Sequence, residues 1–527
     1  MRPVSFRSLN LWLLFLSSAL GLRLVTAADK APQPGDEYRG VNVKESAWRS
    51  GAPGAVVPAS VRIDETVVIK PFSKQLFGYN FDWEGNSHIL PDPKTGGIDP
   101  RAAELLQGVP FPLNRFAGGE SQRFAWKGTI GPVDQRPEQL LWKWAKPHRV
   151  LPGLLETWQW IHRLDPKAEL TWVPNLDQEL DSNYAELAAF LTGQPDRVPH
   201  EVKAWAQRRI DLGVKDPIPV AIWEIGNEMD IVGQPRWTIA RYLAACKKAI
   251  REIRTVDKHG KIAVTAASAP WNPGYAVPGQ PWQHWHRELL RELGPQLDYI
   301  VFHPYYSGYP TAMMERCLDE IRDDIKKITG SDRIKLYISE HARWPDLEKK
   351  KHYQSHSLEG CLAASQFLLR CLNRPDVGPA NYHSFSSFPW GMIYRDKNSG
   401  QLYTTGLADL FRLYGKIPGG DVVQVALDGA MTDPTKDDLS LTAGAVRDGK
   451  TLYVAITNMG PARAVALSTK RPAKVTEAWI FTGAGPDAYN RYGQQEITLA
   501  PWTALKKGIT VDKLDVPSGA LLLLKLE

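Results

Sequence analysis

Between residues 75 and 385 the chain alternates short apolar runs with longer amphipathic stretches, and this alternation limits the fold more than any other feature. The runs have strand length and read QLFGYNF, FPLNRFA, AELTWVPN, PVAIWEIG, KIAVTAA, LDYIVFHP, IKLYISE and PANYHSF. The stretches between them, such as LETWQWIHRLDP, NYAELAAFL, IARYLAACKKAIREIRTVD and EGCLAASQFLLRCLN, repeat apolar residues at helical spacing. Eight strands that alternate with helices predict an α/β fold, a closed (β/α)8 barrel (TIM barrel) over residues 73–415.

A doubly wound open sheet is the competing fold for such an alternation. That fold usually has a glycine-rich turn of the GxGxxG type after an early strand, and no such turn follows the early runs. The closed barrel is therefore favoured.

The pattern changes after about residue 415. LSLTAGAV, TLYVAITNM, AVALSTK, KVTEAWIF, GITVDKL and GALLLLKLE are short alternating runs with turn residues between them. They predict an antiparallel β-sandwich domain over residues 416–527. The run SVRIDETVVIKPF has the same style, so a strand over residues 57–72 is expected to join this C-terminal sandwich.

The N-terminal residues suggest export. Arg2 and Arg7 precede an apolar run over residues 11–20, and small residues follow up to Ala27 and Ala28. This predicts a signal peptide over residues 1–27 and a secreted or periplasmic protein. The run is too short to span a bilayer comfortably, although Arg23 behind it leaves an uncleaved anchor open. Residues 28–56, rich in Pro, Gly and charge, predict a linker or irregular arm.

The charge balance argues against some classes of partner, and the cysteine spacing argues against a metal site. The chain has 64 Lys and Arg against 58 Asp and Glu, an excess too small to imply nucleic acid or a membrane as a partner. The four cysteines are Cys246, Cys317, Cys361 and Cys371, and no CxxC pair occurs. They imply neither a metal site nor a cofactor, and both disulfides and buried free thiols stay possible. The oligomeric state is left open.

Polar residues follow five of the predicted barrel strands, at the barrel face where active sites lie. They are Asn80 and Asp82, Arg115 and Glu120, Asn227 and Glu228, His303, Tyr305 and Tyr306, and Glu340 and His341. Each carboxylate taken alone could cap a helix N-terminus, and His303 could be a satisfied core residue. Glu228 and Glu340, however, follow buried strands on opposite sides of one barrel, so we expect them to converge on one pocket.

Two facing carboxylates without metal ligands match the needs of glycoside hydrolysis. One must carry a proton for the leaving oxygen, and the other must be ionised to attack the anomeric carbon or to activate water. Each negative charge raises the pKa of its neighbour, which helps to keep one proton available.

The segment WEIGNEMD, at residues 223–230, resembles the acid/base motif of the retaining glycosidases that use two glutamates on a (β/α)8 barrel. More closely, the chain resembles the α-L-arabinofuranosidases of glycoside hydrolase family fifty-one. LNRFAGGESQRFAWKGTIGPVDQRP, LDYIVFHPYY, ISEHARW and GPDAYNRYGQQEITL are similar to segments of that family in the same order.

The resemblance implies a role for each matching residue. Glu228 would be the general acid/base and Glu340 the nucleophile. Asn227 would bond the sugar's 2-OH, Tyr305 would hold the nucleophile, and Arg115 would support it from below. His303 and Trp344 would line the sugar site. Asp82 and Glu120 would contact the sugar ring at positions where the family usually has Glu and Asn.

The expected function is therefore retaining hydrolysis that releases arabinose from plant-type polysaccharides or oligosaccharides, without a cofactor or metal. Two alternative functions are also compatible with these residues. One is another retaining glycosidase that acts on a pyranoside such as a xyloside, galactoside or uronide. The other is an inactive carbohydrate-binding protein.

Overall fold

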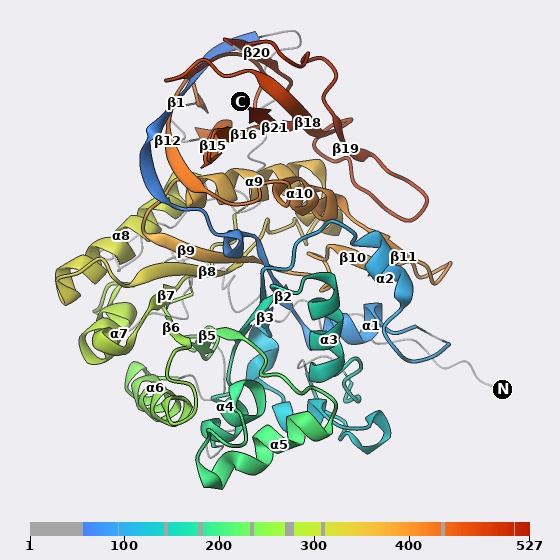
Figure 1. The fold of residues 1–527 in the computed structure, drawn as a ribbon, viewed down its shortest axis with the longest axis vertical. Helices are drawn as coiled ribbons and strands as arrows, with labels where there is room; N and C mark the ends of the chain where they lie inside the picture. Colours follow the sequence, from blue (N-terminus) through green and yellow to red (C-terminus); the bar gives the residue numbers. More distant parts are fainter. Residues whose placement is uncertain are drawn as a thin grey trace, which may run out of the picture.

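The fold was obtained as a computed structural model. It describes residues 56–92, 94–141, 146–177, 183–231, 237–268, 279–306, 311–433, 438–510 and 512–527. The predicted signal peptide and nearly all of the predicted linker lie outside these described residues. Figure 1 shows two parts, a barrel surrounded by helices and a β-sheet domain packed on one side of it.

The centre of the larger part is a closed barrel of parallel strands in sequence order, as the apolar runs predict. Its strands are β2 (Gly78–Phe81), β3 (Leu113–Phe116), β4 (Glu169–Trp172), β5 (Val220–Ile225), β6 (Lys261–Thr265), β7 (Tyr299–Val301), β8 (Lys335–His341) and β9 (Val377–Tyr382). The barrel closes where β9 pairs with β2, with Tyr79 beside Tyr382.

The barrel interior changes from apolar to polar toward the C-terminal ends of the strands. An apolar layer contains Leu113, Ile222, Ala263, Val301 and Tyr337, which form one buried cluster. Side chains two residues apart on a strand share a face, so the next inward layer consists of residues two positions further along. On β3, β5, β8 and just after β7, those residues are Arg115, Glu224, Ser339 and His303. The sequence thus places a polar layer on an apolar floor, directly below the barrel mouth.

Helices surround the barrel, and short ones fill its loops (Figure 1). They are α1 (Trp83–Ile89), α2 (Pro100–Leu105), α3 (Leu154–Leu164), α4 (Tyr184–Thr192), α5 (Lys203–Asp211), α6 (Ile239–Arg254), α7 (His284–Leu293), α8 (Thr311–Thr329), α9 (Leu358–Leu372) and α10 (Gly406–Tyr414). In α6 the Thr238 side chain caps the N-terminus by accepting the Arg241 N–H, and one face, including Tyr242 and Cys246, is buried. None of the helices in the described ranges is both long enough and apolar enough to cross a membrane.

The second part is a nine-stranded sheet curved around its own apolar core, in the order β19-β18-β21-β16-β15-β12-β1-β17-β20. Its strands are β1 (Val56–Pro71), β12 (Asp421–Asp428), β15 (Leu441–Asp448), β16 (Thr451–Asn458), β17 (Ala462–Thr469), β18 (Val475–Gly483), β19 (Ile497–Pro501), β20 (Lys513–Val516) and β21 (Ala520–Leu526). All neighbours are antiparallel except β1 and β17. The parallel pair arises because β1 enters from the N-terminal side of the chain and is inserted between β12 and β17.

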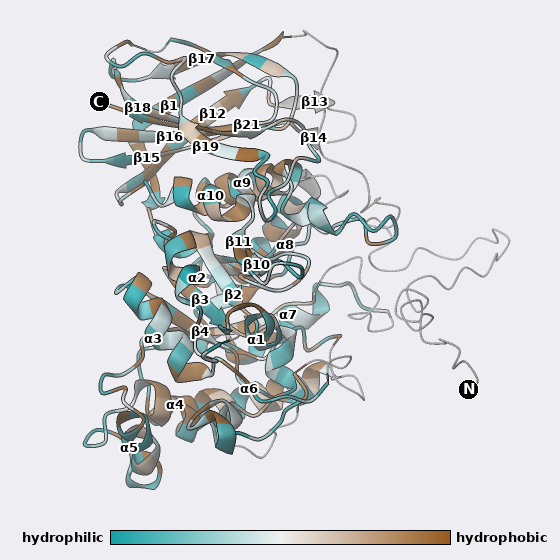
Figure 2. Cartoon of the chain, turned by 90° about the vertical axis from the view of Figure 1, so that its right-hand side faces the viewer, coloured by the Kyte–Doolittle hydropathy of each residue, from teal (hydrophilic) through white to brown (hydrophobic). Residues whose placement is uncertain are grey.

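Two short hairpins, β10 (Ile393–Arg395) with β11 (Leu402–Thr404) and β13 (Met431–Asp433) with β14 (Asp438–Leu439), complete the strands of the described chain. Helices α9 and α10 lie between the barrel and the sheet domain (Figures 1 and 2). All four cysteines are free and buried, so the thiol alternative holds in this structure.

Candidate active site

Glu228 and Glu340 meet at the mouth of the barrel. Glu340 is near the end of β8, and Glu228 follows β5. One carboxylate oxygen of each, together with a ring nitrogen of His303, all lie within 4.8 Å of one another. Glu228 adopts a positive φ of 45°, rare for a residue with a side chain, two residues after Gly226 at φ 82°. Backbone strain of this kind costs about 1–3 kcal/mol and tends to occur at functional sites.

Two donors hold the carboxylate of Glu340 in its ionised form. Arg115 Nη1 donates to Oε1 over 2.8 Å, and the Tyr305 hydroxyl donates to Oε2 over 2.7 Å. Burial alone would raise the pKa of Glu340, but the positive charges of His303, Arg115 and His383 and the bond from Tyr305 outweigh it. The pKa of Glu340 therefore lies well below its usual range, as a nucleophile requires.

Glu224, which the sequence analysis did not single out, neutralises part of the charge of Arg115. The Nε and Nη2 atoms of Arg115 both donate to the Glu224 carboxylate over 2.6 Å, and both side chains are fully buried. Arg115 Nη2 also donates to Oδ1 of Asn227 over 2.6 Å, which fixes the orientation of that amide. A bidentate pair of this geometry holds Arg115 rigidly under Glu340.

A chain of hydrogen bonds runs from Glu228 back to Glu224. Nδ1 of His303 lies 2.9 Å from Oε1 of Glu228, and Nε2 of His303 lies 2.8 Å from Oγ of Ser339. Ser339 in turn donates to Oε1 of Glu224 over 3.0 Å. Burial lowers the pKa of His303, but the carboxylates of Glu340 and Glu228 raise it by more, so that it lies above the usual value.

This chain fixes where protons can be. The Ser339 hydroxyl uses its hydrogen on Glu224, so its oxygen accepts the hydrogen of His303 Nε2. The contact between His303 Nδ1 and Glu228 then needs one proton, carried either by the carboxyl group or by the ring. The geometry thus stores a transferable proton beside Glu228, as a general acid requires.

Gly118 lets the backbone come close to Glu340. A Cβ atom at this position would lie 2.5 Å from Glu340 Oε1 and 3.2 Å from Arg115 Nη1. Any side chain here would displace the carboxylate of Glu340. Glycine is needed at this position because the backbone lies close to that carboxylate, and not because of a turn.

The two remaining carboxylates, Asp82 and Glu120, lie together beside the site. Glu120 is buried, and its oxygens accept the backbone N–H of Trp83 over 2.6 Å and of Glu84 over 3.1 Å. Burial, and then the charge of Asp82, raise the pKa of Glu120 well above its usual value. Asp82 accepts the Ser387 hydroxyl over 2.5 Å. The contact of either residue with a sugar stays a prediction.

Aromatic rings form the rim of the site. Trp344 is 38% exposed, and its ring packs edge-on against the ring of Tyr305 with centroids 5.4 Å apart. Trp390 and His383, neither of them predicted, lie beside the same tyrosine. Tyr306 and His341 point elsewhere: they bond each other over 2.9 Å within the core.

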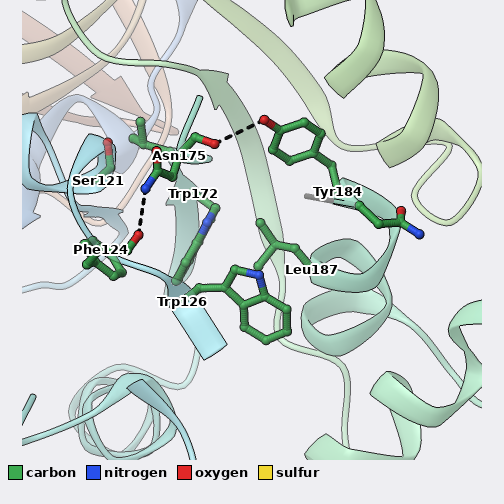
Figure 3. Close-up of a pocket in the computed structure, with 9 residues that line it drawn as sticks. Ser121, Phe124, Trp126, Trp172, Asn175, Tyr184 and Leu187 are labelled. Carbon is green, nitrogen blue, oxygen red and sulfur yellow. Dashed lines mark hydrogen bonds between the residues drawn. The ribbon is translucent and has the colours of Figure 1, made fainter. Parts of the chain in front are cut away.

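A nearby small cavity is not a second binding site. It is bounded by Trp126, Trp172 and Leu187, with Asn175 bonded to Phe124 and Tyr184 (Figure 3). Its volume of ≈ 10 Å³ is at most that of a single water.

A (β/α)8 barrel with two carboxylates at its mouth is an arrangement suited to glycoside hydrolysis. Comparison with known proteins is more specific. Residues 107–302 match the family model of the Alpha-L-arabinofuranosidase 1 domain. The chain is 26% identical over 258 residues to the intracellular exo-α-(1→5)-L-arabinofuranosidase of Acetivibrio thermocellus, covering 48% of this chain and 47% of that protein. It is 25% identical over 264 residues to the one of Halalkalibacterium halodurans, covering 47% and 49%.

Solved structures give the same likeness over a larger share of the chain. The GH51 arabinofuranosidase of Xanthomonas axonopodis pv. citri is 18% identical with a TM-score of 0.72, covering 89% of this chain and 100% of that one. The arabinose complex of the Thermotoga maritima α-L-arabinofuranosidase is 19% identical with a TM-score of 0.71, covering 89% and 99%. These likenesses confirm the predicted fold and the resemblance seen in the sequence. The chain spans about half the length of the curated relatives that it matches.

The predicted secreted or periplasmic location is wrong by the same comparison. The relatives from Acetivibrio thermocellus, Streptomyces lividans, Halalkalibacterium halodurans and Bacillus subtilis are all named intracellular. The prediction rested on a short apolar run behind two arginines and on the small residues after it, and Arg23 lies between them, where a cleavage site needs uncharged residues. A run of that length is weak support for a targeting signal.

Proposed function

We propose that this protein is a retaining glycoside hydrolase that releases L-arabinofuranosyl units from arabinose-containing oligosaccharides or polysaccharides. The single observation that carries the proposal is the facing pair of carboxylates, Glu340 bonded by Arg115 and Tyr305 and Glu228 bonded by His303. Retaining enzymes have their two carboxyl groups about 5–5.5 Å apart, and inverting ones about 6.5–9.5 Å. Carboxylate oxygens within 4.8 Å of each other support the retaining class.

In the first step, a Glu340 carboxylate oxygen attacks the anomeric carbon and the bond to the leaving oxygen breaks. Glu228 gives its proton to that oxygen as it departs. The products of this step are an ester between Glu340 and the sugar, a free alcohol, and a Glu228 carboxylate beside His303. Arg115 and Tyr305 hold the nucleophile in place without moving a proton.

In the second step, Glu228 takes a proton from water as the water oxygen attacks the anomeric carbon. The ester bond to Glu340 breaks, the sugar leaves with its original configuration, and Glu228 is protonated again. Asn227 is proposed to bond the sugar's 2-OH, since its Oδ1 is fixed on Arg115 and its amide N–H groups face away from it. Trp344 and His303 line the sugar, with Asp82 and Glu120 at its far side.

A panel of nitrophenyl glycosides tests the activity. We expect hydrolysis of the α-L-arabinofuranoside at a kcat/KM at least a hundred-fold above that of the β-D-xylopyranoside, β-D-galactopyranoside and β-D-glucuronide, within the range that differential binding can supply. A pyranoside preference would replace the proposed sugar, and binding without any turnover would favour a carbohydrate-binding protein. The comparisons favour neither alternative.

A further inference from the structure

The proposed acid/base residue, Glu228, lies in a strained turn that the surrounding structure has to hold in place. Gly226 has a φ of 82° and Glu228 a φ of 45°, and the Glu228 carbonyl accepts the N–H of Ile231 over 2.9 Å. The turn is also crowded, because a Cβ atom at Gly226 would lie 2.8 Å from Cγ of Met229. A residue with a side chain keeps a positive φ only where its surroundings fix the backbone. The contacts on either side of Glu228 therefore decide where its carboxyl group lies.

A tyrosine holds the chain before the turn. The Tyr242 hydroxyl, on α6, donates to the carbonyl of Ile225, the last residue of β5, over 2.5 Å. The oxygen of the same hydroxyl accepts the backbone N–H of Thr265, the last residue of β6, over 3.0 Å. The end of β5 is thus joined to the end of β6 through one buried phenol group.

A carboxylate holds the chain after the turn. Asp230, two residues beyond Glu228, is buried, and each of its oxygens accepts one hydrogen from Ser268. The backbone N–H of Ser268 donates to Oδ2 over 3.0 Å, and its hydroxyl donates to Oδ1 over 2.6 Å. Ser268 follows the end of β6 by three residues. Hydrogen bonds to an ionised carboxylate are stronger than neutral ones, so this pair joins the loop after β5 firmly to the loop after β6.

The position of Asp230 is unfavourable for a charged group. Burial raises the pKa of Asp230 to about 6, the hydrogen bonds from Ser268 oppose that rise, and the charge of Glu228 adds to it. The effect of Glu228 shows that the two carboxylates are near each other. At pH 7 Asp230 is ionised and accepts both hydrogens of Ser268. An apolar residue would avoid the desolvation of this charge but would leave the two loops unconnected here.

We propose that Asp230 is a positioning residue, which holds the Glu228 carboxyl group at the reaction centre by joining the loop after β5 to the loop after β6. The proposal rests on the function proposed above and adds a residue that acts through Glu228 rather than on the sugar. Without this connection the turn can relax, and Glu228 moves away from Nδ1 of His303 and from the leaving oxygen. A displacement of about 1 Å in an active site can cost roughly 10²-fold in rate.

The loss should be confined to the steps that use the acid/base group. The nucleophile, Glu340, is on a different strand, β8, where Arg115 and Tyr305 bond its carboxylate. These contacts do not involve Asp230. A substrate with a good leaving group needs little help from an acid, so the attack of Glu340 on it should continue when Glu228 is displaced.

Two substrates that differ only in their leaving group test this with the whole protein at pH 7. Methyl α-L-arabinofuranoside has a poor leaving group, and a dinitrophenyl α-L-arabinofuranoside has a good one. In Asp230→Ala, kcat/KM for the methyl glycoside should fall at least about 30-fold, a part of the 10²–10⁴-fold that acid–base catalysis contributes. For the dinitrophenyl glycoside kcat/KM should fall by less than about three-fold, because the acid contributes little to that step.

Two further variants separate the hydrogen bonds of Asp230 from its charge. In Asp230→Asn, the amide oxygen can accept the Ser268 N–H and the amide NH2 group can donate to the Ser268 hydroxyl. Activity on both glycosides should therefore stay within about three-fold of the unmodified enzyme, since both bonds are kept. Ser268→Ala removes one bond with a smaller change to the core, and should lower kcat/KM for the methyl glycoside alone by about two- to ten-fold.

Asp257→Ala is the matched control, because Asp257 joins the same two strands at the start of β6 rather than at its end. Its carboxylate accepts the indole N–H of Trp223, on β5, over 2.8 Å and the backbone N–H of Gly260, ahead of β6, over 2.8 Å. Its removal should lower the melting temperature. Any change in kcat/KM should be equal for the two glycosides.

Equal loss on both glycosides in Asp230→Ala would overturn the proposal, since Asp230 would then only stabilise the fold. A loss in Asp230→Asn as large as in Asp230→Ala would also overturn it, because the charge and not the connection would be needed. If Asp230→Ala did not fold, the leaving-group difference in Ser268→Ala would decide.

The two proposals fail in different ways. If the nitrophenyl panel identified another sugar, the proposed activity would be wrong, and the two glycosides would be made from that sugar with the same expectation for Asp230. A protein that hydrolyses no glycoside would overturn both proposals. An active enzyme without the leaving-group difference would overturn only the role of Asp230.

Discussion

Nδ1 of His303 lies 2.9 Å from Oε1 of Glu228, and the other ring nitrogen of His303 is bonded to Ser339. The ring and the carboxyl group therefore share one proton. The acid/base chemistry of Glu228 thus depends on His303, which is buried below the site. The same polar layer holds Arg115 under the nucleophile through Glu224. The two halves of the proposed reaction therefore depend on one hydrogen-bonded network.

The Ser339→Ala variant tests the shared proton. Loss of the Oγ acceptor removes one hydrogen bond from the protonated ring of His303, so its pKa should fall. The alkaline limb of the kcat/KM profile should move down by about one pH unit, since one hydrogen bond of about 0.5–1.5 kcal/mol corresponds to roughly that shift. Steady-state rates from pH 5 to 9 would measure it.

Ser365→Ala is the matched control, because Ser365 is a buried serine whose hydroxyl bonds Tyr414 and Thr457 at the base of the sheet domain. It should leave the limb in place. An unchanged limb in Ser339→Ala would show that the proton is not held through this chain.

The Tyr305→Phe variant tests how the nucleophile is kept ionised. The Tyr305 hydroxyl lowers the pKa of Glu340, so its removal should raise that pKa. The acid limb of kcat/KM should then move upward by about one to two units, the size expected for a lost hydrogen bond to a charged group. Below that limb the nucleophile is protonated and inactive. Tyr306→Phe removes the neighbouring hydroxyl, which bonds His341 instead, and should leave the acid limb unchanged.

The Gly118→Ala variant should inactivate the enzyme without unfolding it. Its Cβ would come within 2.5 Å of Glu340 Oε1, and the carboxylate would have to leave its place between Arg115 and Tyr305. A displacement of about 1 Å in an active site can cost roughly 10²-fold in rate, so kcat should fall at least that far. Gly97→Ala, where the nearest atom would be 3.7 Å away, should keep both rate and melting temperature. A fully active Gly118→Ala enzyme would contradict the assigned position of Glu340.

The Glu120→Gln variant tests the buried carboxyl group through stability. The pKa of Glu120 is raised on folding, so its contribution is fully present below the unfolded pKa, about 4.3, and is lost as pH rises through the folded pKa. The free energy of unfolding of the unmodified protein should therefore fall with rising pH by up to about 1.4 kcal/mol per unit in that window. The free energy of unfolding of the Glu120→Gln variant should not show this fall with pH, and urea denaturation between pH 4 and 8 would measure it. If the free energy of unfolding changed equally with pH in both proteins, folding would not raise the pKa of Glu120.

Much of the fold could be predicted from the sequence, because buried strands and amphipathic helices leave clear periodic patterns. All eight apolar runs correspond to barrel strands. In the sheet domain β12 and β19 were not predicted, since DVVQVALD and ITLAP each have one exposed side and few large apolar residues. Of the predicted strand at residues 508–514, only the part from Lys513 belongs to a sheet strand, since Gly508 has a positive φ and Thr510 makes only an isolated bridge with Lys474.

The site was predictable where polar residues follow strands and hidden where they lie within them. Glu228 and Glu340 are at strand ends, where a charged side chain stands out. Glu224 and Ser339 are inside β5 and β8 and look like interruptions of a core pattern. A glutamate within an apolar strand is nonetheless a signal, since a buried charge needs a partner. The identity of that partner, Arg115 on β3, depends on register across the barrel, which the sequence does not contain.

The most direct test of the central claim is to trap the sugar on the enzyme. Without its acid/base residue, a Glu228→Ala variant should still be attacked by substrates with a good leaving group, such as a dinitrophenyl α-L-arabinofuranoside, but should release the sugar slowly. Digestion and mass spectrometry of the quenched variant should then find one pentosyl unit on the peptide that contains Glu340. An adduct on another residue, or rapid turnover with no adduct at all, would contradict the account.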